Sequence, residues 1–493
     1  MNIETKPRPN IIFILVDDMG WRDLSCTGSI YYETPHVDSL AKNGMMFTQG
    51  YEAASLCSPS RAAIFTGKAP ARIGVTQVIE NDSTARTLYK DYRARMRSGE
   101  ACGFLSPDEL TISRALKNEG YATCFLGKWH LGHDDAYFPD KHGFDVALGQ
   151  CYEYRIPHFG RWTQQVGFQD MVDDDYMPER LTDKALEFIE QRANEPFFLF
   201  LSHWVPHLPA EGRPEVIEYY EKKRERDDQC SPVYASMIDA VDKSVGRILD
   251  KLKSLEIEEN TLVVFTSDNG GLEQIRQDDR WICEFPEDLS ELDMITTSNR
   301  PLLGGKSLPF EAGTRVPLLI SWPGTIRSSS RCDTPVIGMD FYPTLLEMAG
   351  IPLLPEQHLD GVSLANLLLD NGDLKRRPMY WHFPHYTHAA GPYSVMIDED
   401  RWKCIEFFED GGCLLYDLTN DPYEERDLAQ GEQRRALESR NRMANWRESV
   451  GAAMPSFQDE SKTNGEVRGR GFSLNWAETY RELTTKMGEL WRR

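Results

Sequence analysis

Long hydrophobic runs are missing from this sequence. The apolar run from Ile11 to Val16 is far shorter than the roughly 20 residues that a transmembrane helix needs. Residues 1–9 also lack the apolar segment of a secretory signal peptide. The sequence as it stands therefore predicts a cytoplasmic protein without a membrane partner. A periplasmic or secreted location is the alternative if an export signal has been removed.

Positive charge is also scarce. The chain carries 55 lysine and arginine residues against 78 aspartate and glutamate residues, for a formal net charge of −23. Such an acidic chain disfavours nucleic acids and anionic membranes as partners. An anionic substrate would need a local cationic pocket that works against this overall field. The hydrophobic content of 40% and the charged content of 27% are otherwise those of an ordinary soluble globular protein.

Cysteine patterns of the paired kind are absent. The cysteines are scattered, with no C-x-x-C motif and no zinc-ligand spacing, so no zinc site is predicted. Most of them are expected to be reduced, buried thiols. Cys404 and Cys413 fall in one predicted hairpin that would bring them near each other, although nothing in the sequence requires a disulfide.

Apolar strands alternate with helices over most of the chain. Ile11 to Val16 is a continuous β-branched run, typical of a buried parallel strand. The other predicted strands are Met45 to Tyr51, Tyr121 to Leu126, Phe197 to Leu201, Leu262 to Thr266 and Val316 to Trp322. The predicted helices are Pro35 to Asn43, Asp108 to Asn118, Thr182 to Arg192, Pro232 to Leu255 and Met339 to Ala349. This alternation predicts an α/β fold with a large, mostly parallel sheet between helices.

The carboxy-terminal part has a different pattern. Tyr393 to Ile397, Trp402 to Phe407 and Cys413 to Leu418 are predicted to be short antiparallel strands joined by turns. Gln430 to Val450 has helical spacing. We therefore predict a main domain over residues 1–370 and a smaller α+β subdomain with an antiparallel sheet over residues 371–493.

Cys57-Ser58-Pro59-Ser60-Arg61 is the stretch around which a reactive site can be built. Pro59 suits the first turn of a helix, where a missing N–H costs nothing. Cys57 would then stand at the start of that helix, beside free N–H groups that attract anions. Arg61 lies one turn later, and its guanidinium fits a tetrahedral oxyanion. Taken alone, such a cysteine is more often a structural thiol.

Four side chains with oxygen donors follow two of the buried strands. Asp17 and Asp18 close the first strand, and Asp268 and Asn269 follow the strand that starts at Leu262. Ligands gather at the carboxyl ends of parallel strands, and carboxylates placed together repel unless a cation lies between them. Hard oxygen donors suit Ca²⁺ or Mg²⁺. The alternative is that each pair is an ordinary strand-ending turn.

Several motifs in order resemble the signature segments of one enzyme family. They are Cys57 to Arg61 with Thr66-Gly67, Gly127-Lys128-Trp129-His130-Leu131-Gly132, Pro206-His207, and Gly304-Gly305-Lys306 with Glu311 to Pro317. Over Asn10 to about Pro352 the chain resembles the type I sulfatases of the alkaline phosphatase superfamily, in particular the arylsulfatase A and N-acetylgalactosamine-6-sulfatase branch. The resemblance implies an alkaline-phosphatase-like sheet sandwiched by helices, with the carboxy-terminal subdomain packed beside it.

The resemblance implies a modified residue and a metal. Cys57 would be oxidised to formylglycine (3-oxoalanine) by a formylglycine-generating or anaerobic sulfatase-maturating enzyme, and its hydrate would attack sulfur. Asp17, Asp18, Asp268 and Asn269 would bind the metal, which is usually Ca²⁺ in the family; the sequence does not separate it from Mg²⁺.

The resemblance also implies roles for the cationic motif residues. Arg61, Lys128 and Lys306 would hold the charged sulfate oxygens. His207 would protonate the departing alcohol. His130 would help the proton move when the second hydroxyl of the hydrate collapses to the aldehyde and expels sulfate.

Six further residues are candidates for contacting the substrate. Arg22 lies near the first metal-binding strand and would meet a second anionic group or form a surface salt bridge. Arg155 and His158 follow a family-like segment in a region that varies with specificity. His203 would orient the substrate or, as the favoured alternative, pack in the core. His382 and His385 stand among aromatic residues, either as a glycan-facing wall or as core and loop histidines.

The sequence therefore predicts a sulfuric ester hydrolase (EC 3.1.6 type) that acts on a sulfated carbohydrate as an exo-acting glycan sulfatase. One alternative is a formylglycine-dependent hydrolase of phosphonate monoesters or phosphodiesters. Another is a non-catalytic sulfoglycan-binding protein with an unmodified Cys57, against which the intact aspartate, lysine and histidine motifs argue. The sequence makes no prediction of the oligomeric state.

Overall fold

The computed structural model describes residues 8–79, 95–149, 158–160, 166–225, 227–273, 296–370, 372–375, 377–387, 390–457 and 476–482. Its longer strands in the main part are β1 (Asn10–Val16), β2 (Gly44–Tyr51), β4 (Ala122–Gly127), β6 (Phe197–Ser202), β7 (Thr261–Ser267) and β8 (Arg315–Ser321). The longer helices there are α1 (Pro35–Lys42), α2 (Cys57–Thr66), α4 (Ile112–Asn118), α5 (Met177–Arg192), α7 (Pro232–Ser254) and α9 (Phe341–Met348). Shorter elements are β5 (Val146–Leu148), β9 (Ser330–Cys332), β10 (Val336–Ile337), α3 (Pro70–Ile73), α8 (Glu311–Thr314) and α10 (Ala365–Leu368).

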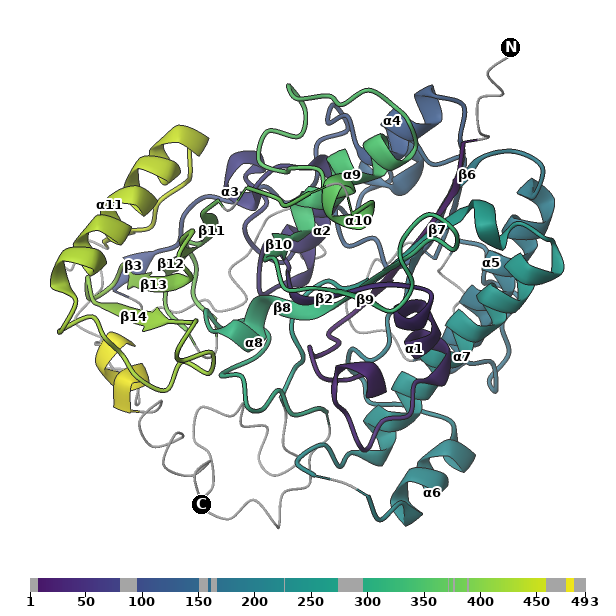
Figure 1. The fold of residues 1–493 in the computed structure, drawn as a ribbon, viewed down its shortest axis with the longest axis horizontal. Coiled ribbons are helices and arrows are strands. Elements are labelled where there is room, and N and C mark those ends of the chain that lie inside the picture. Colours follow the sequence, from purple (N-terminus) through teal and green to yellow (C-terminus); the bar gives the residue numbers. More distant parts are fainter. Residues whose placement is uncertain are drawn as a thin grey trace.

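One large mixed sheet runs through the centre of the molecule (Figure 1). Among the described residues it has nine strands, in the order β10-β2-β8-β7-β1-β6-β4-β5, with β9 also paired to β2. β1 is parallel to β6 and to β7, and β4 is parallel to β5 and β6. β8 is antiparallel to both of its neighbours, β7 and β2. The predicted mostly parallel α/β sheet is therefore confirmed.

The central strand β1 supplies side chains to two separate cores. One core contains residues of α1, α5 and α7 together with Ile12, Ile14 and Val16. The other contains residues of α2, α4 and α9 together with Ile11, Phe13 and Leu15. Because side chains alternate between the faces of a strand, a strand covered on both faces must be apolar throughout. The two helix layers lie on opposite sides of the sheet (Figure 1).

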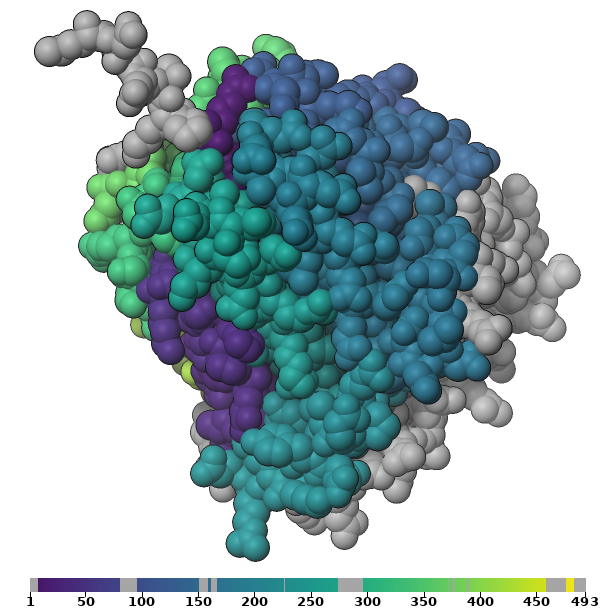
Figure 2. Space-filling view, turned by 90° about the vertical axis from the view of Figure 1, so that its right-hand side faces the viewer, coloured from purple at the N-terminus to yellow at the C-terminus, as the bar shows by residue number. Residues whose placement is uncertain are grey.

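The α5 and α7 side of the molecule is covered further by α6 (Pro214–Lys222), which has no counterpart in the sequence-based expectations. Tyr220 is its one buried residue, while Val216 is partly buried and packs against the core. The Tyr31 hydroxyl donates to the Tyr220 carbonyl oxygen at 2.9 Å. In Figure 2 the purple amino-terminal residues lie beside the teal atoms of this region.

Two helices begin four or five residues away from the expected start. α4 begins at Ile112 instead of Asp108, because the Thr111 side chain caps it by accepting the N–H of Arg114. A threonine cap satisfies one of the free N–H groups at a helix start. α5 begins at Met177 instead of Thr182, since proline is tolerated in the first helical turn and Pro178 stands there.

The carboxy-terminal part forms a second, smaller sheet. β11 (Met379–Phe383), β12 (Tyr393–Ile397), β13 (Trp402–Phe407) and β14 (Cys413–Asp417) are antiparallel, and α11 (Gln433–Val450) packs on them. Figure 1 shows this unit to one side of the large sheet. The predicted α+β subdomain is confirmed, with β11 as a strand that the sequence analysis did not include. Cys404 and Cys413 are free cysteines on neighbouring strands of this sheet.

The division of the chain at residue 370 stays a prediction. β11 begins the smaller sheet at Met379, whereas β3 (Met96–Arg97), from the first part of the chain, pairs with β15 (Ser456–Phe457). Within the described part of the chain, no helix has both the length and the apolar character needed to cross a membrane.

Candidate active site

The site lies where β1 and β7 end side by side. Val16 of β1 is in register with Ser267 of β7, so the residues that follow each strand are neighbours. The backbone N–H of Asp18 donates to Oδ1 of Asp268 at 3.2 Å. Asp17, Asp18 and Asp268 are all buried, which makes this the predicted grouping of carboxylates at the carboxyl edge of the sheet.

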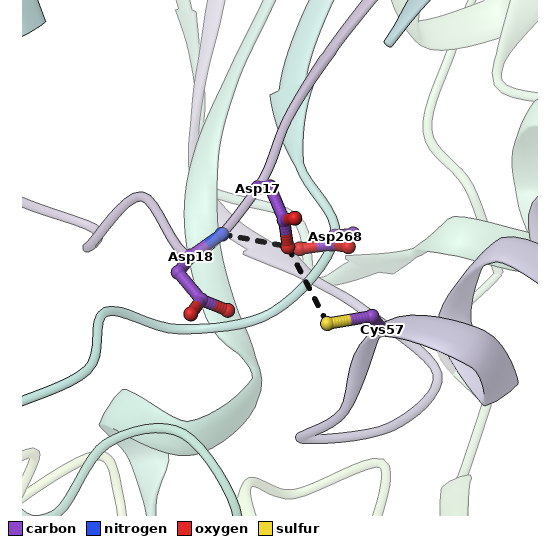
Figure 3. Close-up of side chains that lie close together, drawn as sticks. All are labelled: Asp17, Asp18, Cys57 and Asp268. Carbon is purple, nitrogen blue, oxygen red and sulfur yellow. Dashed lines mark hydrogen bonds between the residues drawn. The ribbon is translucent and has the colours of Figure 1, made fainter. Parts of the chain in front are cut away.

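Cys57 is the first residue of α2, after Leu56 at the N-cap. Its Sγ donates to Oδ1 of Asp17 at 3.4 Å. One oxygen each from Asp17, Asp18 and Asp268 and the Cys57 Sγ all lie within 4.8 Å of one another. Figure 3 shows the thiol pointing from the helix start toward the Asp17 carboxylate. The thiol thus faces the strand ends, not solvent.

Two lysines face the carboxylates from opposite parts of the chain. Lys128 follows β4; its Nζ forms an ion pair with Asp17 and lies 3.6 Å from the Cys57 Sγ. Lys306 lies in the loop before α8, and its Nζ donates to Oδ2 of Asp18 at 2.7 Å. Lys128 is fully buried, and the side chain of Lys306 is 12% exposed. Two ammonium groups therefore lie beside the carboxylates and the thiol, each paired with one aspartate.

Arg61 lies inside the site with protein partners around its guanidinium. Its Nε and Nη2 lie 2.8 Å and 2.7 Å from Oδ2 of Asp268. Its Nη1 donates to the Ser202 Oγ at 2.7 Å and to the carbonyl oxygen of Lys128. These contacts give Arg61 the task of holding Asp268 and the end of β6 in place.

His207 lies beside Asp18, and His130 and His133 share one backbone carbonyl as a partner. Nε2 of His130 lies 3.1 Å from the Ile79 carbonyl oxygen, so Nε2 donates and Nδ1, which is buried without a described partner, is left as an acceptor. Nε2 of His133 donates to the same carbonyl at 2.9 Å. Nδ1 of His207 donates to the Leu208 carbonyl oxygen at 2.7 Å. The other ring nitrogen of His207, Nε2, lies 3.7 Å from Oδ2 of Asp18.

Burial and neighbouring charges set the protonation of the acidic groups and the thiol. Burial by itself raises the pKa of Asp17, but the cations around it, led by Lys128, hold that pKa well below its usual range. Burial and then Asp17 raise the pKa of Asp268 to about 6. Burial, together with Asp17 and Asp268, raises the pKa of the Cys57 thiol well above its usual value. The thiol is therefore neutral and is a poor nucleophile as it stands.

Burial and neighbouring charges also set the protonation of the lysines and histidines. Burial opposes the charge on Lys128, yet Asp17 raises its pKa above the usual value. Burial and then Lys306 lower the pKa of His207 to about 4. Burial and then Lys128 lower the pKa of His130 well below its usual value. The two lysines thus carry the positive charge, and both histidines are neutral near pH 7 in the free protein.

The residues present fit a hard divalent metal. The donor atoms are carboxylate oxygens, with the amide oxygen Oδ1 of Asn269 beside them; this oxygen is buried and has no hydrogen-bond partner among the described residues. Nδ2 of Asn269 donates to Oδ1 of Asp18 at 2.8 Å, which fixes which amide atom remains available. Oxygen donors of this kind are those of Ca²⁺ and Mg²⁺ sites.

The six substrate candidates lie in different places. Arg22 pairs with Asp228 at 2.6 Å and with Asp227 at 3.3 Å. Nε2 of His158 donates to the His207 carbonyl oxygen at 2.8 Å. Arg155 lies outside the described residues.

The three remaining candidates are held by other parts of the protein. His203 is fully buried and lies 3.0 Å from the Ser244 Oγ. His382 uses both ring nitrogens, with the Ser394 Oγ and the Ala453 carbonyl oxygen as partners. His385 is buried, with Nε2 at 2.9 Å from the Thr76 Oγ1. These contacts are those of packed histidines, the alternative that the sequence analysis left open for each.

Family models identify the family of this chain. The model of the family described as Sulfatase matches residues 9–351, which is more than half of the chain. The chain belongs to the sulfatase family. A second model, described as N-sulphoglucosamine sulphohydrolase, C-terminal, matches residues 305–449 of the sulfatase. Its family makes the protein a sulfuric ester hydrolase.

Individual relatives agree with this assignment. The sulfatase is 33% identical over 392 residues to N-acetylgalactosamine-6-sulfatase of Canis lupus familiaris, covering 76% of this chain and 68% of the relative. It is 28% identical to arylsulfatase G of Rattus norvegicus, covering 86% and 83%. A crystal structure of Ps i-CgsB in complex with k-i-k-neocarrahexaose superimposes with a TM-score of 0.73 at 26% identity, covering 97% of this chain and 99% of that one.

Two site residues of the sulfatase were missed by the sequence analysis. His133 follows His130 by three positions and binds the same Ile79 carbonyl; the repeated histidine was a signal that could have found it. Ser202 accepts a hydrogen bond from Arg61. Its position directly after the predicted strand Phe197 to Leu201 was the available signal, since ligand-binding residues gather at such strand ends.

Proposed function

We propose that this sulfatase removes sulfate from a sulfated carbohydrate, with Cys57 converted to formylglycine. We also propose that Asp17, Asp18, Asp268 and Asn269 hold a divalent metal, Ca²⁺ or Mg²⁺. The observation that carries the proposal is the position of Cys57. Its Sγ lies within 4.8 Å of three carboxylates and 3.6 Å from Nζ of Lys128.

Conversion of Cys57 explains why a cysteine occupies this position. A buried thiol beside two carboxylates resists ionisation, so an unmodified thiol is a poor nucleophile here. Oxidation replaces its sulfur by oxygen and removes hydrogen, and a separate formylglycine-generating or anaerobic sulfatase-maturating enzyme would carry it out. The hydrated aldehyde supplies the hydroxyl that attacks sulfur and a second one whose collapse releases sulfate.

The lysines bind the ester and the metal assists them. When bound, the metal supplies positive charge that stabilises the sulfate oxygens and lowers the pKa of the attacking hydroxyl. Lys128 and Lys306 place two further positive charges at the same spot, where burial strengthens their attraction for an anion. Arg61 acts behind them by orienting Asp268 through its two short contacts.

Two histidines handle protons. His207 has Nδ1 fixed by the Leu208 carbonyl, which leaves Nε2 to carry the proton that the departing alcohol oxygen needs. The negative charge of the bound ester favours the imidazolium form. His130 has Nε2 fixed by Ile79 and its free Nδ1 on the other side of the ring, so it is placed to accept a proton during sulfate release.

The choice of a carbohydrate rests on the neighbours. One relative is named N-acetylgalactosamine-6-sulfatase, and one similar structure was solved with k-i-k-neocarrahexaose. The phosphonate monoester hydrolase of Agrobacterium radiobacter shares the fold with a TM-score of 0.63 but only 20% identity, so it supports the fold alone. Exo action stays a prediction from the sequence.

The test combines turnover with the state of Cys57. Protein from its native host is assayed for release of inorganic sulfate from a panel of sulfated saccharides, beside a phosphonate monoester. The peptide that contains Cys57 is analysed by mass spectrometry. Cys57→Ala is compared with Cys102→Ala, which removes an exposed cysteine. We expect sulfate release by the wild type and by Cys102→Ala, none by Cys57→Ala, and a lighter Cys57 peptide.

Each part of the proposal has its own contradicting result. Turnover by protein whose Cys57 is an intact thiol would rule out the formylglycine. Faster hydrolysis of the phosphonate than of every sulfate ester would overturn the substrate. Saccharide binding without turnover, in protein that carries formylglycine, would favour the non-catalytic alternative.

A further inference from the structure

The loop around Lys306, residues 303–310, is hydrogen-bonded to the two segments that carry Asp268 and Cys57. The backbone N–H of Lys306 donates to the Gly271 carbonyl oxygen at 3.1 Å, just after the Asp268 strand end. The next N–H, that of Ser307, donates to the Ser55 carbonyl oxygen at 2.8 Å, just before Cys57. The position of the Lys306 ammonium group therefore depends on how this loop is held.

The loop is short and closed by its own hydrogen bonds. The N–H of Leu308 donates to the Gly305 carbonyl oxygen, and the N–H of Ala312 donates to that of Leu303, both at 3.1 Å. Its far end runs into α8, whose first residue is Glu311. Because the loop between Lys306 and Glu311 is short, a displacement of Glu311 is expected to displace Lys306 as well.

Glu311 is fully buried and is held by three groups from other elements. Its Oε1 accepts from Nζ of Lys403 at 3.1 Å, and its Oε2 accepts from the Tyr51 hydroxyl at 2.6 Å. Its backbone N–H donates to Oε2 of Glu424 at 2.8 Å. Lys403 and Glu424 belong to the smaller sheet and the turn after it. Figure 1 shows α8 between the large sheet and this smaller one.

Lys403 is the cation on which this arrangement depends. Its Nζ also pairs with Oε1 of Glu424 at 2.8 Å, and the side chain is 2% exposed. Without it, two carboxylates would face each other out of water, and like charges in a buried place repel strongly. Arg315, at 3.6 Å from Oε2 of Glu311, touches only one of the two.

We propose that Lys403 is a positioning residue for the sulfatase reaction: by holding Glu311 and Glu424 together it sets the Lys306 loop, and so the Lys306 ammonium group, against the site. The carboxy-terminal sheet is in this way a part of the catalytic apparatus through its contacts with α8. The inference rests on the proposed role of Lys306 in binding the sulfate group.

The experiment is a double-mutant cycle on the full-length, metal-loaded enzyme. We measure kcat/KM on the ester that releases sulfate most readily, and the inhibition constant of inorganic sulfate, for Lys403→Met, Lys306→Ala and the double variant. Misplacement of a binding group by a remote change lowers the rate by roughly 10- to 100-fold. We expect Lys403→Met to lower kcat/KM by that factor and to weaken sulfate inhibition. In the Lys306→Ala background it should change neither by more than about twofold.

Controls separate positioning from general loss of structure. Met443→Ala removes a buried side chain of the same subdomain without touching the charges, so it should lower the melting temperature while leaving kcat/KM nearly unchanged. Lys403→Arg keeps the charge and should recover most of the activity. Tyr51→Phe, which removes one hydrogen bond to Glu311 and keeps the ring packed on Trp381, tests the same link if Lys403→Met does not fold.

The outcomes distinguish the inference from the function on which it rests. Equal losses from Lys403→Met in the wild-type and Lys306→Ala backgrounds, or unchanged activity in folded Lys403→Met and Tyr51→Phe, would overturn the positioning role alone. Full activity of Lys306→Ala would remove the role of Lys306 and the inference with it. A wild type that releases no sulfate from any ester would contradict the proposed function itself.

Discussion

The guanidinium of Arg61 grips a single oxygen of Asp268, with Nε at 2.8 Å and Nη2 at 2.7 Å from Oδ2. The other oxygen, Oδ1, accepts the Asp18 N–H. The protein therefore orients both oxygens of this carboxylate. Arg61, the arginine of the Cys57 motif, orients one of them. It thus orients a carboxylate that we propose as a metal ligand.

Removal of Arg61 should destabilise the protein. In Arg61→Ala, the buried Asp268 would lose its counter-ion, and breaking a buried ion pair in this way costs about 3–5 kcal/mol of unfolding free energy. Urea unfolding of the variant and the wild type measures the difference. Arg213→Ala, which breaks a more exposed pair with Glu179, is the matched control and should cost less than about 1 kcal/mol. Equal losses in the two variants would contradict the assigned role of Arg61.

Calcium should stabilise the folded protein. Asp17, Asp18 and Asp268 converge within 4.8 Å, and a ligand that binds only the folded state adds about 2.7 kcal/mol at a hundredfold excess over its Kd. We expect the melting temperature to rise when Ca²⁺ is added to chelator-treated protein. The rise should shrink in Asp18→Asn and persist in Asp140→Asn, which changes a carboxylate outside the site. A wild type whose melting temperature ignores both Ca²⁺ and Mg²⁺ would argue against the metal site.

The effect of His207→Ala should depend on the leaving group. General acid catalysis contributes roughly 100- to 10,000-fold, and a sugar hydroxyl needs that proton to depart. A nitrophenolate leaves without it. We therefore expect a large loss of kcat on a sulfated saccharide and a much smaller loss on 4-nitrophenyl sulfate, with exposed His36→Ala as the control. The same loss on both substrates would remove His207 as the proton donor.

His203 should make the protein less stable in acid. Burial lowers the pKa of His203 to about 4, whereas in the unfolded chain it is about 6.5. Between pH 6.5 and 4, His203 binds a proton in the unfolded state but not in the folded state. The unfolding free energy therefore falls as the pH falls. The contribution of His203 is fully present above pH 6.5, and about 3 kcal/mol of it is lost by pH 4.

Urea unfolding at several pH values tests this contribution. His203→Gln keeps a polar side chain near the Ser244 Oγ but does not titrate, so its unfolding free energy should fall less steeply than that of the wild type between pH 6.5 and 4. Taking the difference between the two curves cancels the contributions of the other buried histidines, among them His142, His382 and His385. Parallel curves would show that His203 is protonated with equal ease in both states.

Much of the fold follows from local pattern. The apolar run in β1 predicts a strand covered on both faces, and the two cores on either side of it confirm this. The sequence analysis missed α6, which is short and buries only one residue, Tyr220. Helix starts were misplaced where a single contact decides them, as with the Thr111 cap of α4.

The candidate site could be assembled from the sequence only as a set of residues. Motif order named Cys57, the aspartates, the lysines and His207, because each motif is local. It did not name Ser202, which binds Arg61 from a different strand. Nor did it decide between substrate contact and packing for His203 and His382, because that choice depends on which atoms lie opposite each ring.

The amino-acid sequence by itself therefore determined the α/β class and the inventory of reactive groups, since strand pattern and motif spacing act over a few residues. Only the tertiary structure decided which side chains contact one another. Arg61 meets Asp268 across 207 positions of the chain, and Lys403 meets Glu311 across 92. Such pairs form because packed sheets bring distant segments within hydrogen-bond reach, and buried charges are stable only beside the partner that packing supplies.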